Sequence, residues 1–409
     1  MPPSRLLSSG VVGLILLASY FAEMGTQGVV LRVIVATQAV IDSGRWGDSG
    51  KWVQTYDDGS QRGIYAAPGR TYEPLGDAFT TSALADATLD GPIQASDSRL
   101  TVSDNPAVSV RAGYRLSLLR PIDDGAGFKY AAPNSRLRFV TDSSAIELGI
   151  RFTKLTTHGA FQDTAEILAD GSSVATFTPN ISPDTVSSAV SQKVSVNFGS
   201  SATRTIEVLW PYADSMDFVY LRVKVGATVS AAAARPSGKI CVLGDSITQG
   251  FYATKPSESW AYKLGVAKGR QVINLGYGGR RAIASDGLAI DPSCGAIVYM
   301  IGTNDFLAQV AVSTFQSAVL SALVNMRSVN PTARIYMVSP LYMTATGTIP
   351  ITSYRSAIAS AVTSFADANA AYVDGLTLMT NSASRLQDTV HPNVTGAAEI
   401  SAALAAIVQ

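Results

Sequence analysis

The pattern of apolar and polar residues divides the chain into regions of different period. In AIELGIRF, the apolar residues Ile146, Leu148, Ile150 and Phe152 alternate with polar residues or glycine. A period of two indicates strands with one buried face. ILADGSSVATF reads as a hairpin with an Asp-Gly turn. Several strands of this kind predict an antiparallel β-sandwich, jelly-roll-like in layout, over residues 136–229.

A different pattern begins after residue 238, where short, continuously apolar runs alternate with helical segments. The apolar runs are KICVLG, QVINLG, AIVYMIG, RIYMVSP and AYVDGL, as expected for parallel strands buried on both faces. Between two of them, Phe315, Val319, Ala322 and Met326 recur at helical spacing. The alternation predicts an α/β fold, a three-layer α/β/α sandwich with a five-stranded parallel sheet, over residues 239–409.

The remaining segments are harder to interpret. Within residues 1–40, the run GVVGLILLASYFA is too short for a transmembrane helix. It fits either the apolar part of a secretory signal peptide or an ordinary buried segment. Residues 41–135 are rich in Gly, Asp, Ser and Pro and predict loops and short strands. The segment SAAAARPSG, residues 230–238, is the expected linker.

Composition narrows the range of functions. The 409 residues include 31 Lys plus Arg and 31 Asp plus Glu, which argues against a broadly basic nucleic-acid surface. The low charged fraction of 15% favours an extracellular or particle-borne protein over a cytosolic one. We expect a secreted or extracellular protein, with a virion-associated or cytoplasmic one as the alternative. Cys241 and Cys294 lack metal-ligand spacing and adjoin apolar runs, so we expect buried free thiols.

The ends of the predicted parallel strands carry the candidate chemistry, because ligands of such sheets bind at the carboxyl ends. The stretches there are GDS at 244–246, NLGYGG at 274–279, GTND at 302–305 and, after the fifth strand, DTVHPN at 388–393. Each by itself is compatible with a helix cap or a tight turn. Together at one edge of a sheet, they supply every group that acyl transfer needs.

Three side chains fit a nucleophilic mechanism. The hydroxyl of Ser246 needs a base to take its proton. The chain has two histidines, His158 and His391, and only His391 falls in the predicted α/β region. Asp388 precedes it by three residues and can orient its ring.

Three donors fit an oxyanion hole, which stabilises the tetrahedral intermediate. They are the backbone N–H groups of Ser246 and Gly279 and the side-chain amide of Asn304. We expect Asp305 to be structural, as a cap of the helix that follows.

These four stretches resemble the four sequence blocks of the SGNH, or GDSL-type, hydrolase superfamily, in order and with comparable spacing. The resemblance covers residues 238–409 and implies a flavodoxin-like SGNH fold. It implies that Ser246 is the nucleophile, with Asp388 and His391 from the DxxH block. It also assigns Asn304 and Gly279 to the oxyanion hole, with Gly278 as the alternate to Gly279.

Other hydrolase and nucleotide-binding motifs do not fit. The serine lacks the G-x-S-x-G context of ordinary α/β-hydrolases, and GDSITQG lacks the Gly-Lys of a P-loop. There is no HExxH and no Cys/His cluster. We therefore expect neither a metal nor a cofactor.

The resemblance leaves the substrate open. A β-sandwich ahead of the hydrolase region resembles carbohydrate esterases, which implies a serine esterase that removes acetyl groups from a polysaccharide. The alternatives are a lipase, lysophospholipase or aryl esterase, and a non-catalytic glycan-binding or phage tail-associated module. Candidate substrate contacts are Asp245, Tyr277 and Arg280, and Tyr252 and Trp260 are candidates for stacking on sugar rings. The sequence leaves the oligomeric state undetermined.

Overall fold

The structure is a computed structural model. It describes residues 89–105 without 96, residues 131–155, 164–179 and 188–409, and the single residues 181 and 185. It also describes the backbone of strands at 30–32, 52–55, 61–65, 73–74, 107–111 and 115–119. The predicted signal peptide lies outside the described residues apart from the strand at 30–32, and His158 lies outside them altogether.

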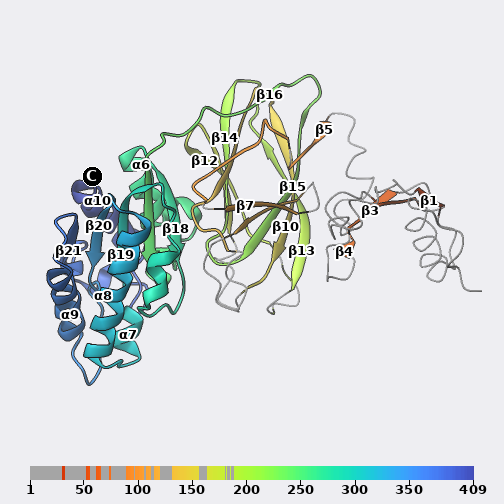
Figure 1. Ribbon diagram of the computed structural model, residues 1–409. Helices are drawn as coiled ribbons and strands as arrows, with labels where there is room; N and C mark the ends of the chain where they lie inside the picture. Colours follow the sequence, from red (N-terminus) through yellow and green to blue (C-terminus); the bar gives the residue numbers. More distant parts are fainter. Residues whose placement is uncertain are drawn as a thin grey trace, which may run out of the picture.

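Five parallel strands form the sheet of the α/β domain, residues 239–409, which is drawn in teal to blue in Figure 1. Their order is β18-β17-β19-β20-β21, the 2-1-3-4-5 order of flavodoxin-like sheets. The predicted parallel sheet is confirmed, and its first two strands have the predicted bounds. The strands are β17 (Lys239–Gly244), β18 (Gln271–Gly276), β19 (Cys294–Met300), β20 (Arg334–Val338) and β21 (Ala370–Val373).

Helices cover both faces of this sheet (Figure 1). On β17, Cys241 and Leu243 pack into a core with α8 and α9, whereas Ile240 and Val242 pack on α6 and α10, as the period of two requires. The α-helices are α5 (Ser246–Gln249), α6 (Trp260–Lys268), α7 (Thr303–Leu307), α8 (Val312–Val329), α9 (Ile351–Phe365) and α10 (Val394–Ile407). The 3-10 helices are η4 (Pro256–Glu258), η5 (Ala284–Leu288), η6 (Gly375–Thr377) and η7 (Ala383–Arg385).

Two antiparallel sheets form the antiparallel domain, residues 89–230, and share one hydrophobic core. The first sheet has the order β13-β10-β15-β8-β7, with β5 paired to β15. Its strands are β5 (Leu89–Gln94), β7 (Ala107–Arg111), β8 (Arg115–Leu119), β10 (Ala145–Thr153), β13 (Ala189–Asn197) and β15 (Ser215–Lys224). The second has the order β12-β11-β14-β9-β16, with β6 paired to β9. Its strands are β6 (Thr101–Ser103), β9 (Arg136–Thr141), β11 (Ala165–Ala169), β12 (Ser172–Phe177), β14 (Arg204–Leu209) and β16 (Val229–Ser230).

The sequence pattern correctly located the core of these sheets but not their beginning. The four alternating apolar residues of β10 are at most 1% exposed. Asp170 and Gly171 form the predicted hairpin turn, with φ of 50° and 79°. However, strands from residue 89 onward pair into both sheets, so the predicted boundary at residue 136 is wrong. Short strands separated by turn residues lack a periodic signal of their own, so their bounds are set by the strands with which they pair.

The backbone of four further strands forms a separate antiparallel sheet in the order β1-β2-β3-β4. These strands are β1 (Val30–Arg32), β2 (Trp52–Thr55), β3 (Gln61–Tyr65) and β4 (Glu73–Pro74). Within the described part of the chain, no helix has the length and apolar character needed to cross a membrane.

Cys241 and Cys294 form a disulfide, with their Cα atoms 5.8 Å apart. The expectation of two free thiols is therefore wrong. The two residues are 53 positions apart in the sequence but lie on the neighbouring strands β17 and β19, with both side chains in the core beneath α8 and α9. Only the pairing of these strands brings the sulfur atoms together.

The antiparallel domain packs against the edge strand β18 of the α/β domain (Figure 1). Asp104, which is 1% exposed, accepts the N–H of Val272 on β18 at 2.8 Å. The buried carboxylate of Glu166 accepts both the N–H and the hydroxyl of Ser257, each at 2.9 Å. Satisfied polar groups at a buried interface fix its geometry, so the two domains dock in one arrangement.

Candidate active site

Ser246 lies where β17 gives way to α5, at the carboxyl edge of the sheet. Gly244 has φ of 152°, and an added Cβ there would lie 2.2 Å from the carbonyl oxygen of Met300. Glycine is therefore required for this sharp turn. Asp245 caps the helix by accepting the N–H of Ile247 at 2.9 Å, and Ser246 follows as the first helical residue.

The structure brings the three predicted side chains together. Ser246 Oγ lies 2.8 Å from His391 Nε2, and His391 Nδ1 lies 2.8 Å from Asp388 Oδ2. This network assigns the tautomer in which Nδ1–H donates to the carboxylate and Nε2 accepts the serine hydroxyl. A base in contact with the hydroxyl and oriented by a third group is the arrangement that activates a serine.

The Asp388 carboxylate is held in its ionised form. Burial alone would raise its pKa, but hydrogen bonds from the N–H groups of His391 and Val390 and from the His391 ring keep the pKa below its usual value. Both backbone bonds end on Oδ1 at 2.7 Å, which leaves Oδ2 for the ring. A negative charge fixed at this position stabilises a protonated imidazole.

Two aromatic residues that follow α5 pack against the His391 ring. The centroid of Phe251 lies 4.6 Å from the imidazole and that of Tyr252 lies 5.5 Å away. The sequence pattern assigned no role to Phe251 and suggested Tyr252 only as a platform for sugars. The adjacent aromatic residues FY at 251–252 are the signal for this contact in the sequence. Only the fold places them beside the ring of His391.

The loop after β18 supplies the second predicted donor. The N–H of Gly278 is taken by the side-chain oxygen of Gln249 at 2.7 Å. Among the described residues, no acceptor pairs with the N–H of Ser246 or Gly279. Gly279 also has a left-handed φ of 77° with open space at its Cβ position. This geometry favours Gly279 over the alternate Gly278 as an oxyanion donor.

Asn304 lies in the first turn of α7 and is partly exposed. Its Nδ2 donates to the carbonyl of Arg280 at 3.1 Å, which uses one of the two N–H groups of the amide. The other N–H remains for a ligand. The bond also ties α7 to the loop that carries Gly279.

Asp305 has a structural position, but not the one expected. Both of its carboxylate oxygens accept the N–H of Ala282, at 3.3 and 3.2 Å. The N-cap of α7 is Gly302 instead, so the predicted capping role is wrong. Burial raises the pKa of Asp305 to about 6.

Two of the candidate substrate contacts, Asp245 and Arg280, form bonds within the protein instead. Asp245 is 0% exposed, so its carboxylate cannot touch a substrate, and the prediction is wrong. Burial raises its pKa to about 7. The guanidinium of Arg280 forms an ion pair with the buried Asp286, which is a bond within the loop rather than a contact with ligand. Tyr277 stays a candidate, because it is partly exposed and its N–H anchors the loop on Gly244 at 3.0 Å.

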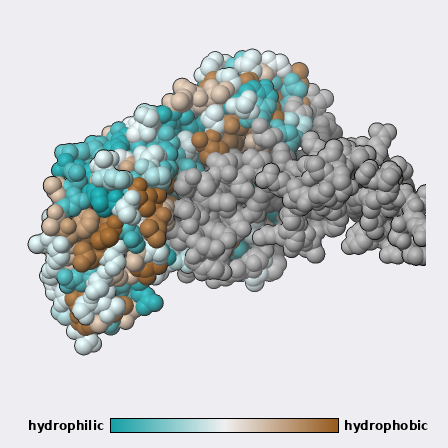
Figure 2. Space-filling model, in the orientation of Figure 1, coloured by the Kyte–Doolittle hydropathy of each residue, from teal (hydrophilic) through white to brown (hydrophobic). Residues whose placement is uncertain are grey.

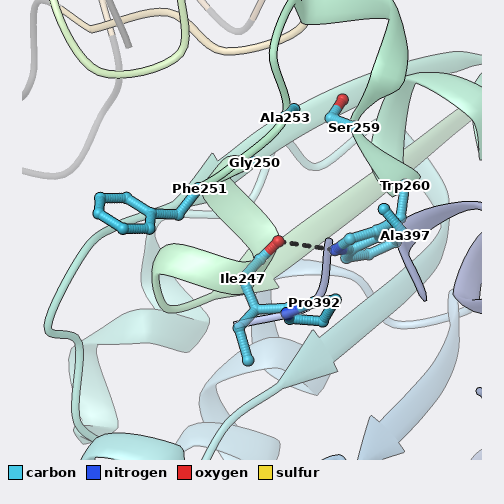
Figure 3. A pocket seen from close by; sticks show the side chains of 8 residues that line it. All are labelled: Ile247, Gly250, Phe251, Ala253, Ser259, Trp260, Pro392 and Ala397. Carbon is cyan, nitrogen blue, oxygen red and sulfur yellow. Dashed lines mark hydrogen bonds between the residues drawn. The ribbon is translucent and has the colours of Figure 1, made fainter. Parts of the chain in front are cut away.

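A small pocket is lined by residues adjacent in sequence to the candidate serine and histidine, among them Ile247 (Figure 3). Trp260 lines it and donates its Nε1–H to the carbonyl of Ile247 at 2.9 Å. At 1% exposure, Trp260 belongs to the core, and the expectation of a sugar platform at this residue is wrong. The other lining residues are Gly250, Phe251, Ala253, Ser259, Pro392 and Ala397. In the described ranges, no three His, Cys, Asp or Glu side chains cluster as metal ligands do.

The fold and the site together define a class of protein. A flavodoxin-like sheet with a Ser-His-Asp chain at its carboxyl edge is the arrangement of an SGNH-type hydrolase domain. Residues 242–399 match the model of the GDSL-like Lipase/Acylhydrolase family. This part of the chain therefore matches a GDSL-type hydrolase domain, and its site brings together the groups that hydrolysis of a carboxylic ester requires.

Solved structures share this fold at low sequence identity. A putative GDSL-like lipase from Bacteroides ovatus is 14% identical with a TM-score of 0.64, over 78% of this chain and 99% of the other. A salicylyl acyltransferase from a tetracycline biosynthetic pathway is 18% identical with a TM-score of 0.63, over 76% and 95%. A family two carbohydrate esterase from Cellvibrio japonicus is 17% identical with a TM-score of 0.58, over 77% and 97%. No curated protein matches this chain in sequence.

Proposed function

We propose that the protein is a serine esterase that removes acetyl groups from a carbohydrate through an acyl-enzyme intermediate. The observation that carries the mechanism is the continuous hydrogen-bonded chain from Ser246 through His391 to Asp388, with both links at 2.8 Å. In this chain, each group stands next to the group with which it must exchange or share a proton.

The first half-reaction acylates the serine. Ser246 Oγ attacks the ester carbonyl carbon as His391 Nε2 takes the hydroxyl proton. The resulting oxyanion accepts hydrogen bonds from the N–H groups of Ser246 and Gly279 and from Asn304 Nδ2. When the intermediate collapses, His391 gives its proton to the leaving sugar oxygen and the acetyl group stays on Oγ.

The second half-reaction releases acetate. A water molecule attacks the acetyl-serine carbonyl as His391 takes one of its protons. Collapse of the second intermediate breaks the bond to Oγ, which regains a proton from His391. The Asp388 carboxylate stabilises the imidazolium in both halves.

Two observations support a carbohydrate as the leaving group. The loops that surround the site, such as FYATKPSESW and GYGGRRAIASDG, are polar and rich in glycine. The likeness to a family two carbohydrate esterase covers 77% of this chain, so it extends beyond the α/β domain. A layout shared at low identity supports the substrate class only by analogy.

A lipase or another acyl hydrolase for longer chains is the second candidate, and one observation favours it. Ile283 and Leu307 are 42% and 45% exposed, on the loop and the helix that carry Gly279 and Asn304. Figure 2 shows hydrophobic residues gathered on the surface of the α/β domain. Apolar side chains beside a catalytic site can hold an acyl chain.

Hydrolysis of a chain-length series separates the candidates. The acetate, butyrate and octanoate esters of p-nitrophenol are compared with acetylated polysaccharides, for which acetate release is measured. We expect the highest kcat/KM on acetate, acetate release from a polysaccharide, and no turnover by Ser246→Ala. A kcat/KM that rises through octanoate favours the lipase, and glycan binding without turnover favours a non-catalytic module.

We also propose that the protein works in an oxidising compartment, outside the cytoplasm. The buried Cys241–Cys294 disulfide supports this, because disulfides persist in secreted proteins and are rare in the cytosol. Fractionation of the native host, followed by thiol alkylation of the protein in each fraction, tests this location. Reduced protein confined to the cytosolic fraction would contradict it.

A further inference from the structure

Gln249, the last residue of α5, joins three segments of the protein through its side-chain amide. It is 3% exposed. Its Oε1 accepts the N–H of Gly278 at 2.7 Å, and its Nε2 donates to the carbonyl of Tyr212 at 2.8 Å. Gly278 belongs to the loop after β18, whereas Tyr212 lies between β14 and β15 in the antiparallel domain.

The orientation of this amide is set by its partners. A carbonyl can only accept and a backbone N–H can only donate, so rotating the amide by half a turn would break both bonds. A buried amide that loses its bonds is costly. Gln249 is therefore held in one orientation, with its oxygen toward the glycine loop.

The antiparallel domain holds its end of this bridge firmly. Tyr212 and Ala213 are each 2% exposed and form a hydrophobic cluster with Ala253, against which Phe251 packs. The same Phe251 contacts the His391 ring. A cluster fixed by packing from two domains gives the Tyr212 carbonyl a defined position.

The bond to Gly278 decides which N–H of the loop faces the site. With the N–H of Gly278 used by Gln249, the N–H of Gly279 is the next along the chain, and among the described residues no acceptor pairs with it. An ideal Cβ at Gly278 would lie 4.0 Å from the Ser246 Cβ, so the loop runs directly beside the serine. A small rotation of the Gly278 peptide would redirect the N–H of Gly279.

We propose that Gln249 is a positioning residue for the oxyanion hole, held in place by the Tyr212 carbonyl of the antiparallel domain. It acts through Gly278 on the Gly279 N–H and does not touch the substrate. The antiparallel domain is then part of the catalytic apparatus. This inference rests on the proposed esterase function, because it concerns how the oxyanion is bound.

Two substitutions of Gln249 test this role. Gln249→Met keeps the shape of the side chain and removes both hydrogen bonds. We expect kcat on p-nitrophenyl acetate to fall about 10- to 100-fold, with little change in KM, because displacement of catalytic geometry affects the transition state most. The matched control is Gln271→Met, which loses one bond to the Pro236 carbonyl at the opposite end of β18 and keeps wild-type kcat.

The pH dependence of kcat in Gln249→Glu distinguishes a positioning role from a purely structural one. A neutral glutamic acid can still donate to the Tyr212 carbonyl and accept from Gly278. A carboxylate has no proton to donate, so it would place an acceptor oxygen against the carbonyl oxygen of Tyr212 and lose that hydrogen bond. Burial raises the pKa of a carboxyl group. We therefore expect the kcat of this variant, relative to wild type, to rise as the pH falls from about 8 to about 5, while the ratio for Gln249→Met stays flat.

Several outcomes overturn the proposal. A folded Gln249→Met protein with kcat within about twofold of wild type, or a Gln249→Glu ratio independent of pH, removes Gln249 from the mechanism. If neither variant folds, amide hydrogen exchange of the wild type decides. Exchange at Gly278 as slow as in the core strands supports the bond, and fast exchange contradicts it. A wild type without esterase activity contradicts the proposed function, whereas an active wild type with unimpaired variants contradicts only the role of Gln249.

Discussion

His391 Nε2 lies 2.8 Å from Ser246 Oγ, although 145 residues separate the two in the chain. The serine is at the end of β17, and the histidine is in the loop that precedes α10. That loop is closed on itself by a bridge between Leu386 and Pro392 and by a bond from the Gln387 N–H to the His391 carbonyl at 2.9 Å. The imidazole is thus presented to the serine by a rigid turn.

Removing the imidazole is expected to be far more damaging than removing its partner. His391→Ala should lower kcat/KM by roughly 10⁴-fold or more, since nucleophile and base act as a unit. Asp388→Ala should cost less, because the carboxylate orients the ring and its side chain is 35% exposed to water. Steady-state kinetics on p-nitrophenyl acetate measure both. An active His391→Ala protein would exclude this histidine as the base.

The side-chain donor of the oxyanion hole can be tested by itself. Asn304→Ala should lower kcat roughly 10²- to 10³-fold, the usual loss for one donor. KM should change little, because the bond forms fully only in the transition state. The bond to the Arg280 carbonyl is lost as well, so thermal unfolding of the variant serves as the control. A folded variant with normal kcat contradicts this role.

The buried carboxyl of Asp245 should make stability depend on pH. Its folded pKa of about 7 lies above the unfolded value of about 3.9. Between these values, the folded state binds more protons than the unfolded state. Its contribution to the free energy of unfolding is therefore greatest below about pH 4 and is lost as the pH rises through about 7.

Asp245→Asn removes this titration and can still accept the Ile247 N–H through its side-chain oxygen. We expect the free energy of unfolding of the variant, relative to wild type, to increase as the pH rises from about 4 to about 7. Urea unfolding of both proteins at several pH values measures the difference. A difference that does not vary with pH would contradict the raised pKa.

The disulfide should contribute to stability and not to catalysis. Replacement of both Cys241 and Cys294 by alanine opens a link between positions 53 residues apart. In the chain-entropy model, this costs about 4 kcal/mol. We expect a lower Tm, with kcat near the wild-type value at temperatures where the variant stays folded. Two free thiols in the unfolded, alkylated wild type would show that the bond does not form.

The sequence by itself determined the framework of the α/β domain. Strands β17 and β18 have the predicted bounds, and Phe315, Val319, Ala322 and Met326 are the buried face of α8. These features follow from local patterns, because a strand buried on both faces must be apolar throughout. The candidate triad was also predictable, since Ser246 follows the end of a parallel strand, Asp388 and His391 come after the last strand, and ligands of such sheets bind at the carboxyl edge.

The tertiary structure alone decided which groups meet across the chain. It paired Cys241 with Cys294, placed Phe251 against His391, and directed Arg280 to Asp286 and away from a ligand. It also favours Gly279 over Gly278 as the candidate oxyanion donor, because Gln249 takes the Gly278 N–H. Each of these outcomes depends on a neighbour that is distant in sequence or on one rotation of a short loop. Apolar periodicity records which residues are buried, and it contains no information about which buried groups share a bond.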